Sequence, residues 1–146
     1  MDSRSLLVVL NRFLALECQQ VALYKGQAKW TGDEHLRRAL ELFADIEMGH
    51  VKNLRREIKR LGGEYSYLVE AADSLGAVMG RASRLPGIGP MLKMNILIEG
   101  RAARDYAGLI RNLSPGPTRD LMWKHRLEEE LHRAWMLEYL RRGRRR

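Results

Sequence analysis

Apolar side chains recur every three or four residues over most of this chain, the spacing that places them on one face of an α-helix. Helices are predicted for four long segments, at about 3–30, 33–61, 90–113 and 118–142. The breaks between them carry residues that begin or end helices. Asp33 can cap the second helix, Gly62 and Gly63 can end it, and the Pro- and Gly-rich residues 114–117 separate the third from the fourth.

The connections between these helices differ in length. Short connections join the first helix to the second and the third to the fourth, whereas residues 64–89 form a long connector that includes a further predicted helix at 67–84. Short loops join antiparallel neighbours, and one long crossover can join two such hairpins. We therefore expect one all-α domain over residues 1–146, an antiparallel four-helix bundle of two helical hairpins with a long, partly helical crossover.

Acidic residues interrupt the apolar face of each helix near its middle, and on the second and fourth helices a His follows three residues later. These residues are Glu17, Glu47, His50, Glu99, Glu129 and His132. A carboxylate buried without a partner costs several kcal/mol, so a core does not carry four by accident. Two divalent cations would balance the four charges, and the i, i+3 spacing presents an oxygen and a nitrogen ligand on one face. Carboxylate and imidazole are the ligands expected for iron or manganese in redox chemistry.

The spacing of these residues repeats in the two halves of the chain. In each half the second Glu follows the first by 30 residues, and a tyrosine follows the first Glu by seven. The two tyrosines are Tyr24 and Tyr106. The repeat predicts two helical hairpins related by a pseudo-two-fold axis.

At these residues the chain resembles the ferritin-like di-iron superfamily, especially rubrerythrin and bacterioferritin domains. The resemblance covers the four long helices and leaves the connector and the basic tail unmatched. It implies two iron ions, with manganese as the alternative metal. Tyr24 and Tyr106 would donate hydrogen bonds to terminal carboxylate ligands. By this resemblance, Glu47 and Glu129 would bridge the two metal ions, and Glu17 and Glu99 would be terminal ligands. His50 and His132 would each bind one ion through the imidazole ring.

Departures from those families narrow the expectation. Rubrerythrins carry a further Glu three residues after the first Glu of the third helix, where this chain has Ala102. A rubredoxin module needs four cysteines, and Cys18 is the one cysteine present. Met48 lies where bacterioferritins place a haem ligand, but a Met at a helical position is more often a packing residue, so haem is not expected. A second relative with the same ligand set is the di-iron quinone hydroxylase of ubiquinone biosynthesis.

Composition and charge bear on the compartment and the partners. The net charge of +8 comes partly from the Arg-rich tail at 141–146, which we interpret as a solvated end and not as a nucleic-acid site. We find no signal peptide and no uninterrupted apolar run of about 18 residues, so we expect a cytoplasmic protein. Gly76 to Gly80 and the apolar region 88–98 can dock on a membrane surface, or pack along the bundle or against another subunit, and packing is preferred.

These features predict a di-iron oxidoreductase that reacts with O2 or peroxide, with rubrerythrin-like peroxidase or ferroxidase activity and electrons from an external donor. Two alternatives stay open, an iron-binding or storage protein and a membrane-associated di-iron hydroxylase of a quinone-like substrate. A homo-oligomer, such as a dimer, and peripheral membrane contact are further expectations.

Overall fold

The computed structural model describes residues 1–65, 76, 78–80, 82–83 and 87–143. Every regular element in this part of the chain is an α-helix, which confirms the predicted all-α, ferritin-like fold class. The long helices are α1 (Ser3–Ala28), α2 (Glu34–Arg60), α4 (Ile88–Arg111) and α5 (Pro117–Gly143). Each end lies within two residues of its predicted position.

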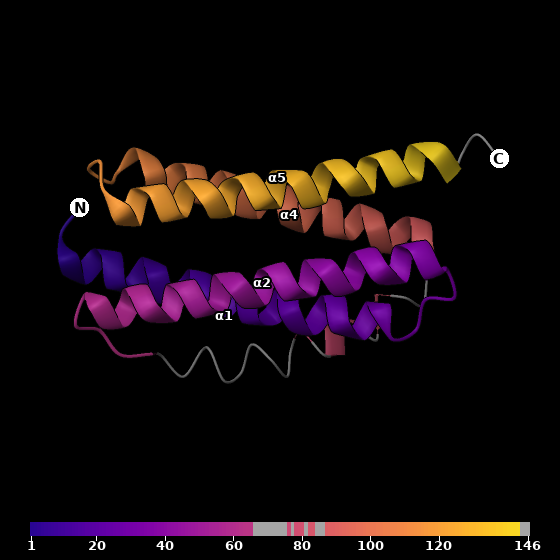
Figure 1. Ribbon diagram of the computed structural model, residues 1–146, viewed down its shortest axis with the longest axis horizontal. Coiled ribbons are helices and arrows are strands. Elements are labelled where there is room, and N and C mark those ends of the chain that lie inside the picture. Colours follow the sequence, from indigo (N-terminus) through magenta and orange to yellow (C-terminus); the bar gives the residue numbers. More distant parts are fainter. Residues whose placement is uncertain (66–75, 77, 81, 84–86, 144–146) are drawn as a thin grey trace. The chain divides into compact units, whose positions relative to one another are not determined.

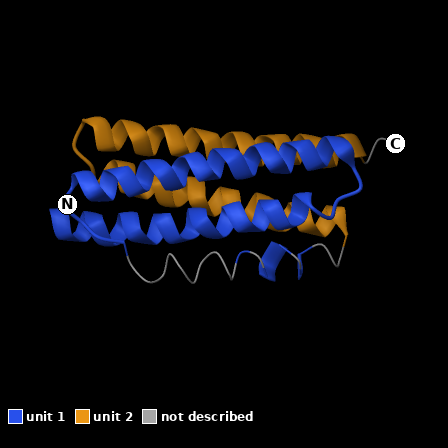
Figure 2. Cartoon of the chain, turned by 60° about the horizontal axis from the view of Figure 1, so that its bottom comes forward, with its two compact units in different colours: residues 1–85 blue, residues 86–146 orange. Residues whose placement is uncertain are grey.

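The chain divides into two compact units, residues 1–85 and 86–146 (Figure 2). In the first unit α1 and α2 lie side by side and antiparallel, and in the second α4 and α5 do the same (Figure 1). Each unit is therefore built on one of the two predicted helical hairpins. Whether they form a single domain over 1–146 stays a prediction.

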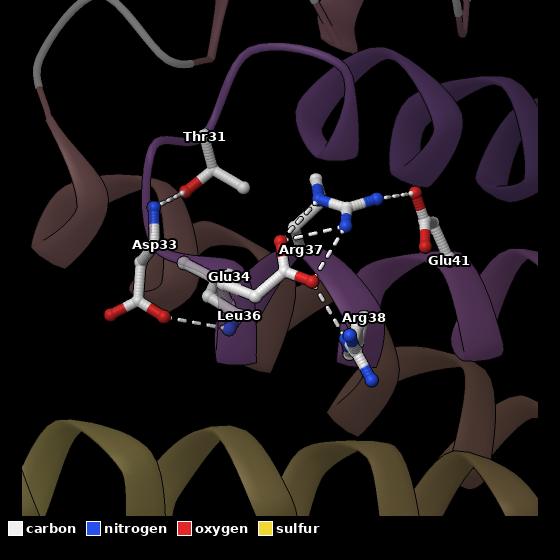
Figure 3. Close-up of polar contacts among 7 residues, drawn as sticks. All are labelled: Thr31, Asp33, Glu34, Leu36, Arg37, Arg38 and Glu41. Carbon is white, nitrogen blue, oxygen red and sulfur yellow. Dashed lines mark hydrogen bonds and ion pairs between the residues drawn. The ribbon is translucent and has the colours of Figure 1, made fainter.

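The start of α2 is fixed by Asp33, the cap that the sequence indicated, and by ion pairs in the first turn (Figure 3). Asp33 has an extended backbone, and its side chain accepts a hydrogen bond from the Leu36 amide at 2.8 Å. Glu34 accepts hydrogen bonds from Arg37 and Arg38, each at 2.7 Å. These contacts satisfy an amide that the first turn leaves without a helical acceptor, and they place negative charge at the positive end of the helix.

The end of α2 is a Schellman motif. Gly62 adopts a positive φ of 75°, which costs glycine little because it has no Cβ. Its amide donates to the carbonyl of Lys59 at 3.0 Å, and the amide of Gly63 donates to the carbonyl of Ile58 at 2.9 Å. The predicted stop at these two glycines is thus explained by the backbone geometry that they permit.

The α5 helix begins at Pro117, one residue before the predicted start. Proline suits the first turn, because the amide it lacks would have no helical acceptor there and its fixed φ is already helical. Gly116, with a φ of 151°, precedes it, and the carbonyl of Gly116 accepts from the Asp120 amide at 3.0 Å.

The described part of the connector packs on α1. A Cβ on Gly76 would collide with the backbone carbonyl of Gln19, and one on Gly80 would lie 2.8 Å from the carbonyl oxygen of Leu23. The side-chain amide of Gln19 also contacts the sulfur of Met79 at 2.9 Å. Packing, the preferred alternative for this segment, is therefore what the structure shows at these residues.

The helix predicted at 67–84 is described in part. Residues 76, 78–80 and 82 are helical, and the other positions of that prediction, apart from the turn at 83, lie outside the described residues. The tail residues 144–146 lie outside them as well.

Among the described helices, α1 is long and apolar enough to cross a membrane by length and composition, with a mean hydropathy of 1.4 over its best window. The sequence showed no uninterrupted apolar run because polar and charged residues, among them Arg12 and Glu17, interrupt this segment. About 44% of the window is buried within the protein, and a core helix satisfies the same criteria. The finding therefore does not by itself place α1 in a membrane.

Candidate metal centre

The α1–α2 hairpin brings three of the predicted ligands together. Glu17 lies on α1, and Glu47 and His50 lie one turn apart on α2; all three are at most 1% exposed. Each offers a ligand atom, and these atoms lie within 4.8 Å of one another. The Nδ1 atom of His50 is 2.9 Å from Oε2 of Glu47 and 3.5 Å from Oε2 of Glu17. The first half of the predicted ligand set is therefore one buried cluster.

The α4–α5 hairpin brings the other three together. Glu99 on α4 and Glu129 on α5 are fully buried, and His132 is 2% exposed. Their ligand atoms also lie within 4.8 Å of one another. The Nδ1 atom of His132 is 3.7 Å from Oε1 of Glu99. The second cluster has the same residue types on the same order of helices as the first.

The two clusters correspond residue by residue at a fixed offset along the chain. In each, the Nδ1 atom of the His faces a carboxylate oxygen of the Glu on the preceding helix, at 3.5 Å in one hairpin and 3.7 Å in the other. The sequence repeat is thus a repeat of local geometry within each hairpin.

The two tyrosines also occupy equivalent positions. Tyr24 and Tyr106 are fully buried, and each ring meets an aromatic ring of the neighbouring helix edge-on. For Tyr24 that ring is Phe43, at 5.7 Å between centroids; for Tyr106 it is His125, at 5.5 Å. The Tyr106 hydroxyl is 3.2 Å from Nδ1 of His125. The predicted donation from the tyrosines to terminal carboxylates stays a prediction, and His125 is a buried partner that sequence analysis did not assign.

Gln20 is a second residue that the sequence analysis missed. Its side-chain amide donates to Oε1 of Glu47 at 3.5 Å, and the residue is 5% exposed. It lies three residues after Glu17, on the same face of α1, so its helical position was the signal available. The equivalent position in the second half is Ala102, which has no group to donate. The surroundings of the two clusters therefore differ at this position.

The chemistry of each cluster suits a divalent metal ion. Two carboxylates carry the charge that balances one such ion, and the imidazole adds a neutral nitrogen ligand. Without a cation, two buried carboxylates this close would repel each other and lose their hydration. The residues present therefore fit one iron or manganese ion in each cluster.

Comparison with known families tests the superfamily that the sequence pattern predicted. The family described as ubiquinone biosynthesis protein COQ7 matches residues 15–146, a range that includes all six predicted ligands. The chain belongs to the COQ7 family. This family is a member of the ferritin-like di-iron superfamily, so the superfamily predicted from the ligand spacing is confirmed. No curated protein matches the chain significantly.

Membership of the COQ7 family changes the expected subtype. The findings support a di-iron oxidoreductase, and within that class they support the hydroxylase alternative and not the rubrerythrin-like peroxidase that we placed first. The rubrerythrin assignment rested on the ligand pattern, which both families share. The missing Glu at Ala102 and the single cysteine were the residues that already separated them.

Proposed function

We propose that this COQ7-family chain is a di-iron hydroxylase that uses O2 to hydroxylate the ring of a ubiquinone precursor. The observation that carries the proposal is the pair of buried Glu, Glu, His clusters, one in each hairpin, in a chain that matches the COQ7 family over residues 15–146. Each cluster offers the donor set for one metal ion, so the chain as a whole offers ligands for two.

The ligand roles follow the superfamily pattern. Glu17, Glu47 and His50 would hold one ion, and Glu99, Glu129 and His132 would hold the other. The bound ions would supply the reducing electrons that O2 activation needs. Iron fits this role and manganese is the alternative, since both accept carboxylate and imidazole ligands.

The residues around the ligands have a supporting role in this proposal. Gln20 donates a hydrogen bond to Glu47 and so favours one orientation of the carboxylate. Burial of all six ligands keeps bulk water away from them. That exclusion protects a reactive centre from side reactions.

The overall reaction fixes what else is needed. Replacing a ring C–H by C–OH with one atom of O2 requires two electrons and two protons, and the second oxygen atom leaves as water. One cysteine cannot form a four-cysteine redox centre within the chain. An external two-electron donor is therefore part of the proposal.

The substrate class implies contact with a membrane, because ubiquinone precursors carry long apolar chains. Large apolar side chains are exposed on the second hairpin, among them Leu97 at 73% and Leu131 at 66%. They support the proposed peripheral contact, since exposed leucines gain free energy when they enter an apolar phase. The cytoplasmic location and the homo-oligomer expected from the sequence stay predictions.

The test is hydroxylation with labelled oxygen. The iron-loaded protein, a chemical reductant and a short-chain quinone precursor lacking the ring hydroxyl are incubated under 18O2. Mass spectrometry should show one labelled oxygen in the product, and Glu47→Ala should abolish it. Glu128→Ala removes a partly exposed carboxylate from α5 that pairs with Lys124, and it should leave turnover unchanged. Unlabelled product, or peroxide consumption without hydroxylation, would refute the proposal.

A further inference from the structure

The surface of the α4–α5 hairpin contains a groove of about 330 Å³. Its α4 side is lined by small residues, Gly100, Ala103 and Ala107, which follow one another along the helix face. Small side chains leave the space, because nothing longer than a methyl group projects from these positions. The groove lies within the second unit, and the buried ligands are not among its lining residues.

Three arginines surround this space. Arg104 comes from α4, and Arg126 and Arg133 come from α5. Two of them converge above Gly100: a Cβ built there would lie 3.4 Å from Nε of Arg133 and 3.6 Å from Nη1 of Arg104. Because both atoms lie that close to one point, they are no more than about 7 Å apart. Two guanidinium groups from different helices thus face the same small volume.

The carboxylates near the groove leave these two charges uncompensated. Glu130 also lines the groove, but it pairs with Arg126, whose Nη2 lies 3.0 Å from its carboxylate. Arg126 in addition lies over the ring of Trp123, at 4.8 Å from its centroid. Within the described ranges, Arg104 and Arg133 form no ion pair with any carboxylate. The net charge of the lining is therefore +2.

We propose that this groove is a phosphate-binding site, in which Arg104 and Arg133 hold one phosphate group between them. A phosphate carries about −1.5 to −2 charges near neutral pH, which matches the lining. The planar guanidinium presents paired donors that fit two phosphate oxygens at once. The small residues of α4 let the anion approach between the helices. This site goes beyond the proposed hydroxylase activity and does not depend on the metal ligands.

The same phosphate chemistry can be offered by a soluble phosphate compound or by a phospholipid headgroup. Both sources present free phosphate oxygens to the two arginines. The charge of the lining matches inorganic phosphate or a phosphate monoester more closely, because a headgroup phosphodiester carries about one negative charge. Leu97, which is exposed one turn before Gly100, does not distinguish a soluble phosphate compound from a phospholipid headgroup. The experiment therefore includes an arm for each.

The first arm is a titration of the 15N-labelled full-length protein with inorganic phosphate, followed by NMR. Saturable shifts are expected at the amides of residues 100–107 and 126–133. The variant Arg104→Gln/Arg133→Gln should weaken binding at least about tenfold, because it removes both charge-assisted contacts. Arg104→Lys/Arg133→Lys keeps the charge without the paired donors. Its affinity for phosphate should lie between that of the unmodified protein and that of Arg104→Gln/Arg133→Gln.

The matched control is Arg101→Gln/Arg111→Gln, which removes two positive charges from the same helix outside the groove. It should bind phosphate as the unmodified protein does. Shifts that do not saturate, that spread over the basic surface, or that persist in Arg104→Gln/Arg133→Gln would overturn the proposal. Far-UV circular dichroism checks that each variant is folded, which we expect because both substituted arginines are exposed.

The second arm distinguishes the sources of phosphate, using flotation with vesicles of phosphatidylcholine with and without phosphatidylglycerol. If Arg104→Gln/Arg133→Gln loses a phosphatidylglycerol-dependent flotation that the control double variant keeps, the site binds a headgroup. If flotation is the same for both variants while phosphate binding differs, the site binds a soluble phosphate compound. Either outcome applies to a site that the phosphate titration has already located at Arg104 and Arg133, and it identifies only the source of the phosphate group.

Discussion

The hydroxyl of Tyr106 lies 3.2 Å from Nδ1 of His125, and both side chains are fully buried. The equivalent pair in the first hairpin is Tyr24 and Phe43, with the same edge-on arrangement of rings. In both hairpins a tyrosine therefore packs on an aromatic ring of the neighbouring helix. In the second hairpin that ring is the imidazole of His125, which can also form a hydrogen bond. A buried hydrogen bond exists in the second hairpin at a place where the first has an apolar contact.

We expect Tyr106→Phe to lower the free energy of unfolding by about 1 kcal/mol, because the substitution removes a buried hydrogen bond. The variant His125→Phe recreates the pair found in the first hairpin. In that background Tyr106→Phe should cost less, so a double-mutant cycle measured by urea unfolding should give a coupling of about 1 kcal/mol. Strictly additive costs would show that the two groups do not interact.

Substitution of a buried carboxylate is expected to have opposite effects on stability in the metal-free and in the metal-bound protein. In the metal-free protein, Glu47→Gln should leave the unfolding temperature unchanged or raise it, because it removes a buried charge beside other carboxylates. With Fe2+ at 100 times its Kd the unsubstituted protein should gain about 2.7 kcal/mol, and the variant clearly less. Calorimetry under anaerobic conditions measures both.

Glu128→Gln is the matched control, since Glu128 lies beside Glu129 and pairs with Lys124 at 3.5 Å. Its metal-dependent gain should equal that of the unsubstituted protein. The same gain in Glu47→Gln would argue against Glu47 as a ligand.

The packing of the connector on α1 predicts a steric cost at Gly76. A methyl group there meets the backbone carbonyl of Gln19, which cannot move without displacing α1. Gly76→Ala should therefore destabilise the protein by about 1–3 kcal/mol. Gly49→Ala is the control, because a Cβ in that helical position meets nothing within 4 Å. It should stabilise by about 0.5–1 kcal/mol. If chemical denaturation gave the same change in stability for Gly76→Ala and Gly49→Ala, the close approach of Gly76 to α1 would be ruled out.

The end of α5 predicts a strongly acidic carboxyl group. Hydrogen bonds from Arg141, at 2.7 Å, and from Arg142, at 2.8 Å, lower the pKa of Glu138 from 4.5 to about 2. Because this pKa is lower in the folded state, the stabilisation is present above about pH 4.5 and is lost as the pH falls toward 2.

A carboxyl 13C NMR titration should place the pKa of Glu138 near 2 in the unsubstituted protein. In Arg141→Gln/Arg142→Gln it should return toward 4.5. An unchanged pKa in that double variant would mean that the arginines do not set it.

Much of the fold and of the candidate ligand set follows from spacing alone. Glu17 and the pair Glu47 and His50 stand on apolar faces at intervals that place them near the middle of paired helices, and the structure brings them within 4.8 Å. The stop at Gly62 follows from a backbone conformation that glycine adopts with little strain. Helical periodicity and cap chemistry are local, so one sequence is enough to apply them.

What the sequence did not predict depends on contacts between helices. The partners Tyr106 and His125 are 19 residues apart, and their contact requires the relative rotation of α4 and α5. The donation from Gln20 to Glu47 likewise crosses from α1 to α2. The choice of subtype was misplaced for another reason, because rubrerythrins and COQ7 proteins share the ligand pattern on which it rested.

The central claim is that both hairpins contribute ligands to two metal ions, and an anaerobic Fe2+ titration followed by metal analysis tests it most directly. The unsubstituted protein should bind two irons per chain and develop an oxo-bridge absorption band when O2 is added. Glu47→Ala, from one hairpin, and Glu129→Ala, from the other, should each abolish that band and the paired stoichiometry. No iron uptake, or two irons per chain in both variants, would contradict the account.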